Sequence, residues 1–140
     1  MKIDKFKIGL MLMIVMLLGA CTRNDGAIGR VHGMWRVTEI LQDGVKNESY
    51  SGTVYFLFQS SVYSQKYVDE FTHGHDNRMA LWHYEGDDVV LHFTDQAPLS
   101  ITGMQVGENY VTIDECNHDN MTMSYVTPKG VIYVYKLKKW

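Results

Sequence analysis

Apolar and polar residues alternate with a period of two through most of the chain after Val31. Successive side chains of a β-strand point to opposite faces, so this alternation is typical of strands. No window shows the three-and-four spacing of apolar residues that an amphipathic helix requires. Turn-forming residues recur at intervals of roughly ten residues, which favours short strands with tight connections. The pattern therefore predicts an all-β domain, either a barrel or a sandwich.

The first three predicted strands cover residues 34–41, 53–59 and 62–71. The second of them is apolar on both faces, because Tyr55 and Leu57 lie opposite its core face. Such a strand is either covered on its outer side or part of an interaction surface. The three core faces comprise Trp35, Val37 and Leu41, then Val54, Phe56 and Phe58, then Tyr63, Tyr67 and Phe71.

A hairpin is predicted between residues 77–84 and 88–94. A two-residue loop at Gly86-Asp87 sets the register of this pairing. Shifting the loop by one residue would mix the two faces, so the pattern itself selects the register. Trp82 then pairs with Leu91, the core face carries Ala80, Trp82, Tyr84, Val89, Leu91 and Phe93, and the outer face carries His83 and His92.

A bent or split strand is predicted between residues 97 and 116, because Gly103 and Gly107 interrupt its alternation. Glycine inside a strand often marks a bulge or a barrel corner. The alternation resumes at Tyr110, so we expect a regular strand from there to Asp114.

The final predicted hairpin joins residues 120–127 to residues 131–139 around Pro128-Lys129-Gly130. A three-residue loop that ends in glycine suits a type I turn followed by a bulge. The large apolar residues of both strands then share one face, with Tyr125 opposite Tyr133 and Met123 opposite Tyr135.

About eight strands thus follow one another in chain order. We expect an eight-stranded antiparallel up-and-down meander that closes into a β-barrel over residues 31–140. Closure removes both edges of the sheet. An eight-stranded barrel has an interior that is either filled by side chains or large enough for one small ligand.

The N-terminal residues 1–20 predict an export signal. Three lysines precede an apolar run from residue 8 to residue 18, and small residues follow it. The run is too short to span a bilayer, since a transmembrane helix needs roughly 20 apolar residues. It ends in Leu18-Gly19-Ala20-Cys21, which resembles the lipobox of bacterial lipoproteins.

This resemblance implies that a signal peptidase cleaves before Cys21, which becomes the acylated, palmitate-bearing first residue of the mature chain. Attachment by more than one acyl chain is stable, whereas one chain holds only marginally. Residues 21–30 are polar and glycine-bearing after the cysteine, as suits a flexible tether. We therefore expect a lipid-anchored protein of the cell envelope, held at the outer membrane. The sequence leaves open whether it lies on the periplasmic or the outer face of that membrane.

A second resemblance concerns residues 31–140. Gly33-Met34-Trp35 opens the first strand, eight strands follow as a meander, and the last strand ends in Lys136-Leu137-Lys138. This combination resembles the lipocalin-like lipoproteins common in Bacteroidota. The resemblance implies that a basic residue near the end of the barrel packs over Trp35, a place that Lys136 or Lys138 would take.

Charge and cysteine content exclude several functions. The full chain has a formal net charge of −3, and the chain without residues 1–20 has a charge of −5. Nucleic-acid binding needs a clustered basic surface, which is missing from this sequence. Once Cys21 is acylated, only Cys116 remains, so an exported protein has no intramolecular disulfide. No cofactor is expected.

The aromatic interior is the candidate ligand site. An apolar cavity with a few polar groups is typical of a small-molecule site, and tyrosine hydroxyls would supply those groups. The alternative is that the same rings simply fill a small barrel. The candidate residues are Trp35, Phe56, Phe58, Trp82, Leu91, Phe93, Tyr125, Tyr133 and Tyr135.

The sequence thus predicts a membrane-anchored, extracytoplasmic lipoprotein that is not an enzyme and whose barrel binds a small apolar or amphipathic ligand. The alternative is a protein-interaction module of the envelope, an inhibitor or a scaffold of a surface complex. Its contact surface would be formed by Tyr55, Leu57, His83 and His92.

The histidines and one cysteine are the residues that could support metal binding or catalysis. Histidines on two adjacent strands can bind zinc, but their spacing here matches no metal motif. Residues 116–119 join a cysteine to a histidine and an aspartate, although neighbours on a turn seldom have the geometry of a catalytic nucleophile and its base. We predict neither a metal site nor a catalytic residue. The histidines concerned are His73, His75, His83 and His92.

Overall fold

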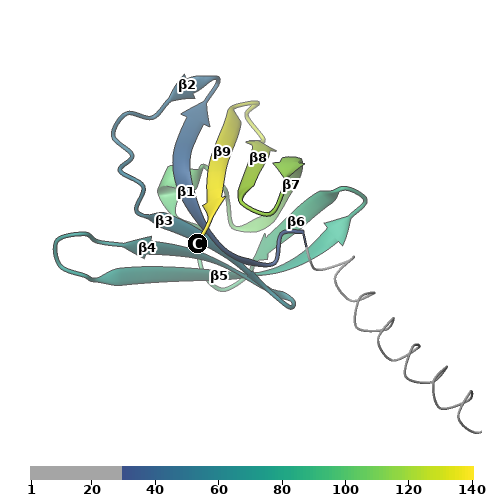
Figure 1. The fold of residues 1–140 in the computed structure, drawn as a ribbon. Coiled ribbons are helices and arrows are strands. Elements are labelled where there is room, and N and C mark those ends of the chain that lie inside the picture. Colours follow the sequence, from purple (N-terminus) through teal and green to yellow (C-terminus); the bar gives the residue numbers. More distant parts are fainter. Residues whose placement is uncertain (1–29) are drawn as a thin grey trace, which may run out of the picture. The chain divides into compact units, whose positions relative to one another are not determined.

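The structure, a computed structural model, describes residues 30–140 and folds most of them into antiparallel β-strands (Figure 1). Each long strand pairs with the next one in the chain, and β1 pairs with β9 as well as with β3. Eight strands therefore close into a barrel, as predicted. The elements are β1 (Gly33–Gln42), β2 (Val45–Lys46), β3 (Val54–Gln59), β4 (Val62–Val68), β5 (His75–Glu85), β6 (Asp88–Phe93), the 3-10 helix η1 (Ser100–Thr102), β7 (Gly107–Cys116), β8 (Asn120–Val126) and β9 (Ile132–Lys139).

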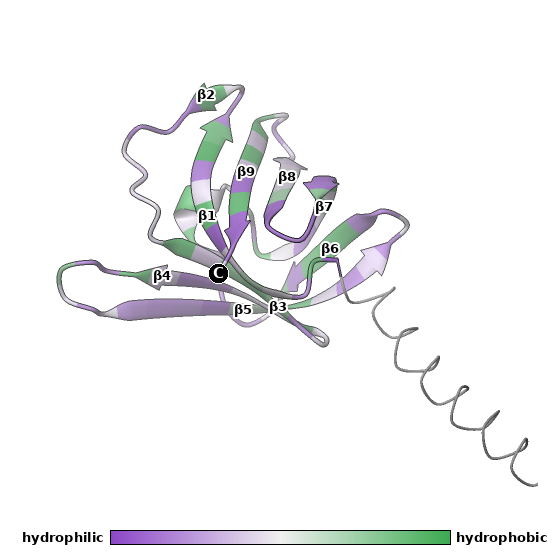
Figure 2. Cartoon of the chain, in the orientation of Figure 1, coloured by the Kyte–Doolittle hydropathy of each residue, from purple (hydrophilic) through white to green (hydrophobic). Residues whose placement is uncertain are grey.

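Both predicted hairpins have the expected registers. Trp82 lies opposite Leu91 across β5 and β6, and Tyr125 lies opposite Tyr133 across β8 and β9. Gly86 has a φ of +63°, a conformation that strongly favours glycine, so the turn residue fixes the register of its hairpin. Figure 2 shows the resulting alternation of hydrophobic and hydrophilic residues along the strands.

The connection after β1 begins with a tight turn. Gln42 pairs with Val45 around Asp43-Gly44, whose φ angles are +50° and +81°. Two central residues with positive φ form the type I′ turn of two-residue hairpins. The short strand β2 that results pairs with β1 outside the closed ring of eight strands.

A β-bulge in β1 corrects the predicted core face of that strand. Strict alternation predicts Leu41 inside the barrel and Ile40 outside. In the structure Ile40 is 1% exposed and Leu41 is half-buried. The pairing of β1 with β9 shifts between Val37 and Glu39, and this bulge adds one residue to β1. The extra residue exchanges the two faces from that point onward.

Strand β4 is shorter than predicted and ends at Val68. Phe71 was expected on its core face, but it lies beyond the strand and is 93% exposed. There the carboxylate of Asp69 accepts hydrogen bonds from the backbone N–H groups of Phe71 and Thr72, an Asx turn that stops the strand. The β4–β5 hairpin that carries this turn extends to one side of the barrel (Figure 1).

Trp35 seals one end of the barrel. Its side chain is buried, and its Nε1–H donates a hydrogen bond to the Val31 carbonyl at 2.8 Å. The ammonium group of Lys139 lies 4.4 Å from the centre of the indole ring and donates to the His32 carbonyl. A Cβ on Gly33 would lie 2.5 Å from that ammonium group, and Gly33 has a φ of +115°, so this position requires glycine.

The basic residue over Trp35 is therefore Lys139, and the prediction of Lys136 or Lys138 was wrong. The register of β1 with β9 places Lys139 directly opposite Trp35. Lys136 instead forms an ion pair with Glu39 at 3.5 Å on the outside of the barrel.

The predicted signal peptide (1–20), the acylated Cys21 and the tether up to residue 29 lie outside the described residues. Residues Val31–Trp140 form one compact unit that contains the whole core. From residue 30 onward, the structure contains no helix with the length and apolarity needed to cross a membrane.

Candidate functional site

The predicted ligand-binding residues all belong to the barrel core or pack against it. Tyr133 is half-buried and the other eight are buried. Strict alternation explains why these residues are buried, since they occupy every second position of their strands. The eight buried residues are Trp35, Phe56, Phe58, Trp82, Leu91, Phe93, Tyr125 and Tyr135.

The rings of these residues surround Tyr63, which was predicted as a core residue but not as part of the site. Its ring centre lies 4.8 Å from that of Phe58, 5.5 Å from that of Phe56 and 6.1 Å from that of Phe93. Phe56 also packs edge-on against Tyr135 at 5.5 Å. Aromatic pairs at such separations stabilise a core beyond the area they bury. Tyr63 is thus the centre of the aromatic cluster.

The hydroxyl group of Tyr63 makes no hydrogen bond of normal geometry within residues 30–140, although the side chain is fully buried. Burial raises its pKa well above the usual value of 10, and the nearby Gln65 side chain offsets part of this shift. A buried polar group without a partner costs about 1–3 kcal/mol of stability. The barrel therefore carries, at its centre, a hydroxyl group that a bound molecule could satisfy.

Three further tyrosines bring hydroxyl groups toward the same region. Burial raises the pKa of Tyr135 well above 10, and so do the neighbouring hydroxyls of Tyr63, Tyr125 and Tyr133. The Tyr135 hydroxyl donates a hydrogen bond to the Thr102 carbonyl. The interior is therefore apolar around its walls and carries a group of neutral polar atoms near its centre.

Gln65 is a polar residue of the interior that sequence reasoning missed. Its side chain is completely buried on β4, its Oε1 accepts a hydrogen bond from the Leu99 N–H at 2.8 Å, and its Nε2 lies 3.1 Å from the Met104 sulfur. A thioether is a weak acceptor, so the amide donor of Gln65 is poorly satisfied. The alternation of the strand does indicate that Gln65 is buried, because it follows Tyr63 by two residues and so occupies a core position.

Residues 94–106, which join β6 to β7, cover one end of the barrel, and we call them the cap. The predicted split strand starts only at Gly107, and the cap contains η1 in place of its first part. Thr102 is completely buried and Met104 is 7% exposed, so the cap fills space inside the barrel. Because strand direction alternates from β1 to β9, the cap lies at the end opposite to Trp35.

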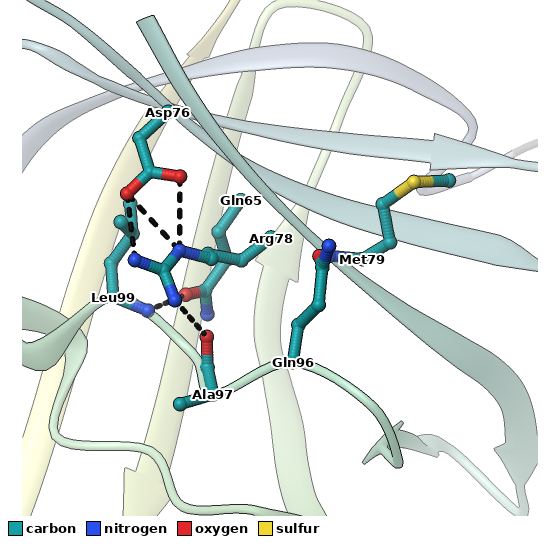
Figure 3. A network of polar contacts seen from close by, with 7 residues as sticks. All are labelled: Gln65, Asp76, Arg78, Met79, Gln96, Ala97 and Leu99. Carbon is teal, nitrogen blue, oxygen red and sulfur yellow. Dashed lines mark hydrogen bonds and ion pairs between the residues drawn. The ribbon is translucent and has the colours of Figure 1, made fainter.

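The cap is also attached to the outside of β5, as Figure 3 shows. The Gln96 Oε1 accepts a hydrogen bond from the Met79 N–H at 2.8 Å. The pairing of β5 with β6 starts only at Leu81, so the Gln96 side chain makes the hydrogen bond to Met79 that a neighbouring strand would otherwise make. Arg78 binds the Asp76 carboxylate through two nitrogens, at 2.8 and 3.0 Å, and reaches the Ala97 carbonyl at 3.4 Å.

The outer-face residues of the alternative prediction are more dispersed. Tyr55 and Leu57 are half-buried on β3, and the Tyr55 ring packs edge-on against Trp140 at 5.3 Å. His83 is exposed on β5 and His92 is half-buried on β6. Strand β4 lies between Tyr55 and Leu57 on β3 and His83 on β5.

A groove of about 340 Å³ does open on the outer side, beside the cap. Met79 and Leu81, about half exposed, line it together with Gln96. Within residues 30–140, no group of three or more histidine, cysteine, aspartate or glutamate side chains is arranged to hold a metal ion.

A closed eight-stranded meander with Trp35 at one end and loops over the other is a lipocalin-like barrel. The fold is similar to that of a lipocalin-like protein from Bacteroides uniformis, with a TM-score of 0.59 and 13% identity over 79% of this chain and 98% of that protein. It is also similar to an uncharacterized protein from Bacteroides eggerthii, with a TM-score of 0.60 and 12% identity over 78% of this chain and 98% of that protein. No family model and no curated protein matches the sequence. At these identities the likeness establishes the fold and carries no ligand with it.

Proposed function

We propose that this protein binds one small apolar or amphipathic molecule inside its barrel, at the bacterial cell envelope. The observation that carries the proposal is the fully buried hydroxyl of Tyr63 at the centre of the aromatic cluster, which makes no hydrogen bond of normal geometry within residues 30–140. A side chain that serves packing alone would be better as phenylalanine, because the hydroxyl costs stability without a partner. The weakly satisfied amide of Gln65 beside it supports the same conclusion.

The test is native mass spectrometry of the protein purified gently from a bacterial periplasm, followed by organic extraction. Residues 31–140 contain the whole core, so the chain from Thr22 onward can be produced without its anchor. We expect a neutral small molecule at stoichiometric occupancy. A clean mass of the unbound protein, together with no uptake of the neutral fluorophore N-phenyl-1-naphthylamine, would contradict the proposal and favour a protein partner.

Replacing Tyr63 by phenylalanine separates binding from packing. The free protein is expected to be as stable as the wild type or more stable by up to about 2 kcal/mol, because an unpartnered hydroxyl leaves the core. Affinity for N-phenyl-1-naphthylamine is expected to fall roughly threefold to tenfold, the contribution of one neutral hydrogen bond. Urea unfolding and fluorescence titration measure the two effects.

Tyr50→Phe is the matched control for that substitution. The Tyr50 hydroxyl donates to the Val37 carbonyl at 2.5 Å and accepts from the Val54 N–H at 3.0 Å. Its loss is therefore expected to lower stability while leaving fluorophore affinity unchanged. If the Tyr63 variant is the less stable of the two and binds normally, the hydroxyl has no role in binding.

We further propose that the barrel is held at the membrane by acylation of Cys21, on the strength of the lipobox-like tetrad that ends there. Cys21→Ser removes the acylated thiol, so the protein is expected to move from the membrane fraction to the soluble fraction and to lose incorporation of labelled palmitate. Cys116→Ser is the control and should remain at the membrane. Membrane retention of the Cys21 variant would refute lipid anchoring.

A further inference from the structure

Resting on the proposed ligand binding, we infer that the cap is a displaceable plug and that an uncharged ligand takes its place in the barrel. The ligand then forms hydrogen bonds with Gln65 and Tyr135 in place of those that the cap makes. Thr102 and Met104 of the cap occupy buried space at the mouth of the barrel, directly beside these two side chains. A molecule that reaches the aromatic cluster from this end must therefore move the cap.

The contacts of the cap inside the barrel are of a kind that a ligand can replace. Gln65 accepts from the Leu99 N–H, and Tyr135 donates to the Thr102 carbonyl. A ligand carbonyl or hydroxyl can accept from Tyr135 and from the amide of Gln65, while its own donor can satisfy the Gln65 oxygen. The exchange conserves hydrogen bonds, and it can give the Tyr63 hydroxyl a hydrogen bond of normal geometry, which its contact with Gln65 does not supply while the cap is in place.

The cap is separate from the strand ladder of the barrel. Strand β6 ends at Phe93 and β7 begins at Gly107, which has a φ of +99° and empty space where a Cβ would lie. The cap is held at the edge of β5 by the Gln96 contact to the Met79 N–H, and at the mouth of the barrel by the longer contact of Arg78 to the Ala97 carbonyl. The packing of Leu99, Ile101 and Met104 against the core and two hydrogen bonds between Gln105 and Asn109 also hold the cap. Opening the cap breaks such contacts and leaves the eight-stranded ladder intact.

The charge of the interior determines the class of ligand. A buried carboxylate or ammonium group needs a countercharge, because its desolvation costs more than hydrogen bonds alone return. At the mouth, the guanidinium of Arg78 is already neutralised by its two-point contact with Asp76. The ligand is thus an uncharged molecule with an apolar body and at least one hydrogen-bonding group. The buried polar side chains within residues 30–140 are all uncharged: Thr53, Ser64, Gln65, Thr102 and Asn109.

Two fluorophores with the same aromatic skeleton test the charge preference. N-phenyl-1-naphthylamine is uncharged, and 8-anilinonaphthalene-1-sulfonate adds one sulfonate to the same rings. We expect the neutral compound to bind at least tenfold more tightly. Equal affinity for both would overturn the inferred preference for an uncharged ligand, and binding of neither would overturn the proposed function together with this inference.

Gln96→Ala tests displacement of the cap from outside the binding site. The variant removes one hydrogen bond that holds the closed cap, so it is expected to speed association of N-phenyl-1-naphthylamine roughly twofold to tenfold and to raise affinity by the same factor. Gln59→Ala, at the exposed end of β3 near Trp35, is the control and should change neither. Because Gln96 binds the edge of β5 and not the barrel interior, a changed association rate reports on the cap and not on contacts with the ligand.

Hydrogen exchange of the Leu99 amide gives an independent readout. In the unbound protein this amide is expected to exchange faster than the Val111 amide of the ladder, since it is released whenever the cap opens. Binding of N-phenyl-1-naphthylamine is expected to change the Leu99 rate. If the fluorophore binds while the Leu99 rate and the Gln96→Ala kinetics stay at their original values, the cap is a fixed wall and the inference is wrong, whereas the proposed function stands.

Discussion

Replacing Trp35 by alanine is expected to lower the free energy of unfolding by about 3–5 kcal/mol. The indole is 1% exposed, packs under the ammonium group of Lys139 and holds the Val31 carbonyl through its Nε1–H. Alanine leaves a cavity at the end of the barrel and an unsatisfied carbonyl beside it. Domains of this size have total stabilities of about 5–15 kcal/mol, so the variant should be close to unfolding at 37 °C.

Urea unfolding followed by circular dichroism measures this effect. Lys139→Met is the matched control, because it keeps a linear apolar side chain over the indole and removes only the charge and its hydrogen bond. Its expected cost is about 0.5–1 kcal/mol, the size of an exposed cation–π contact. A Trp35→Ala variant as stable as the Lys139 variant would mean that this end of the barrel does not depend on the indole.

Alkaline pH is expected to unfold the protein steeply above pH 10. Burial raises the pKa of Tyr63 and of Tyr135 well above 10, whereas tyrosines of the unfolded chain titrate near 10. Above pH 10 the unfolded state therefore binds fewer protons than the folded state, and stability falls as pH rises. Below pH 10 both states keep these protons, so the full stability is present.

The expected slope follows from the number of such groups. Two buried tyrosines give a loss that approaches about 3 kcal/mol per pH unit above pH 10. Tyr50, with a pKa raised to about 12 by burial, adds a smaller share because part of its ring is exposed. Tyr63→Phe removes one of these groups, so it should move the alkaline midpoint to higher pH and reduce the slope.

Absorbance at 295 nm, recorded together with circular dichroism, follows tyrosine ionisation and unfolding in the same sample. Part of the absorbance change is expected to coincide with loss of the β-sheet signal, because the buried hydroxyls ionise only as the barrel opens. Ionisation of all nine tyrosines near pH 10 with an intact sheet signal would contradict the burial of these hydroxyls.

The parts of the fold that were predicted correctly depend on local sequence. The turn at Gly86-Asp87 sets a register that the alternation on both sides then confirms, and the same holds around Pro128-Lys129-Gly130. Other features depend on distant residues. The bulge that turns Ile40 inward exists in the pairing of β1 with β9, and no residue near Ile40 signals it.

The candidate site divides in the same way. Alternation alone identified the apolar walls, because each ring occupies a core position of its own strand. Alternation alone did not identify the polar centre. Gln65 is polar and is recognised as a core residue only from its place in the alternation, and Tyr63 stands out only because its hydroxyl makes no hydrogen bond of normal geometry. The cap could not be inferred from its sequence, because its conformation depends on side chains of β4, β5 and β9.

The pairing of β1 with β9 has a consequence for how the chain folds. Trp35 pairs with Lys139, which lies near the other end of the domain in sequence, so the ring can close only once the last strand is available. Until then β1 and β8 each present an open edge that can pair with another chain. Contacts between such distant segments also slow folding. The interval between synthesis of the first strand and that of the last is therefore when the protein is most exposed to aggregation, and when a chaperone would be of most use to it.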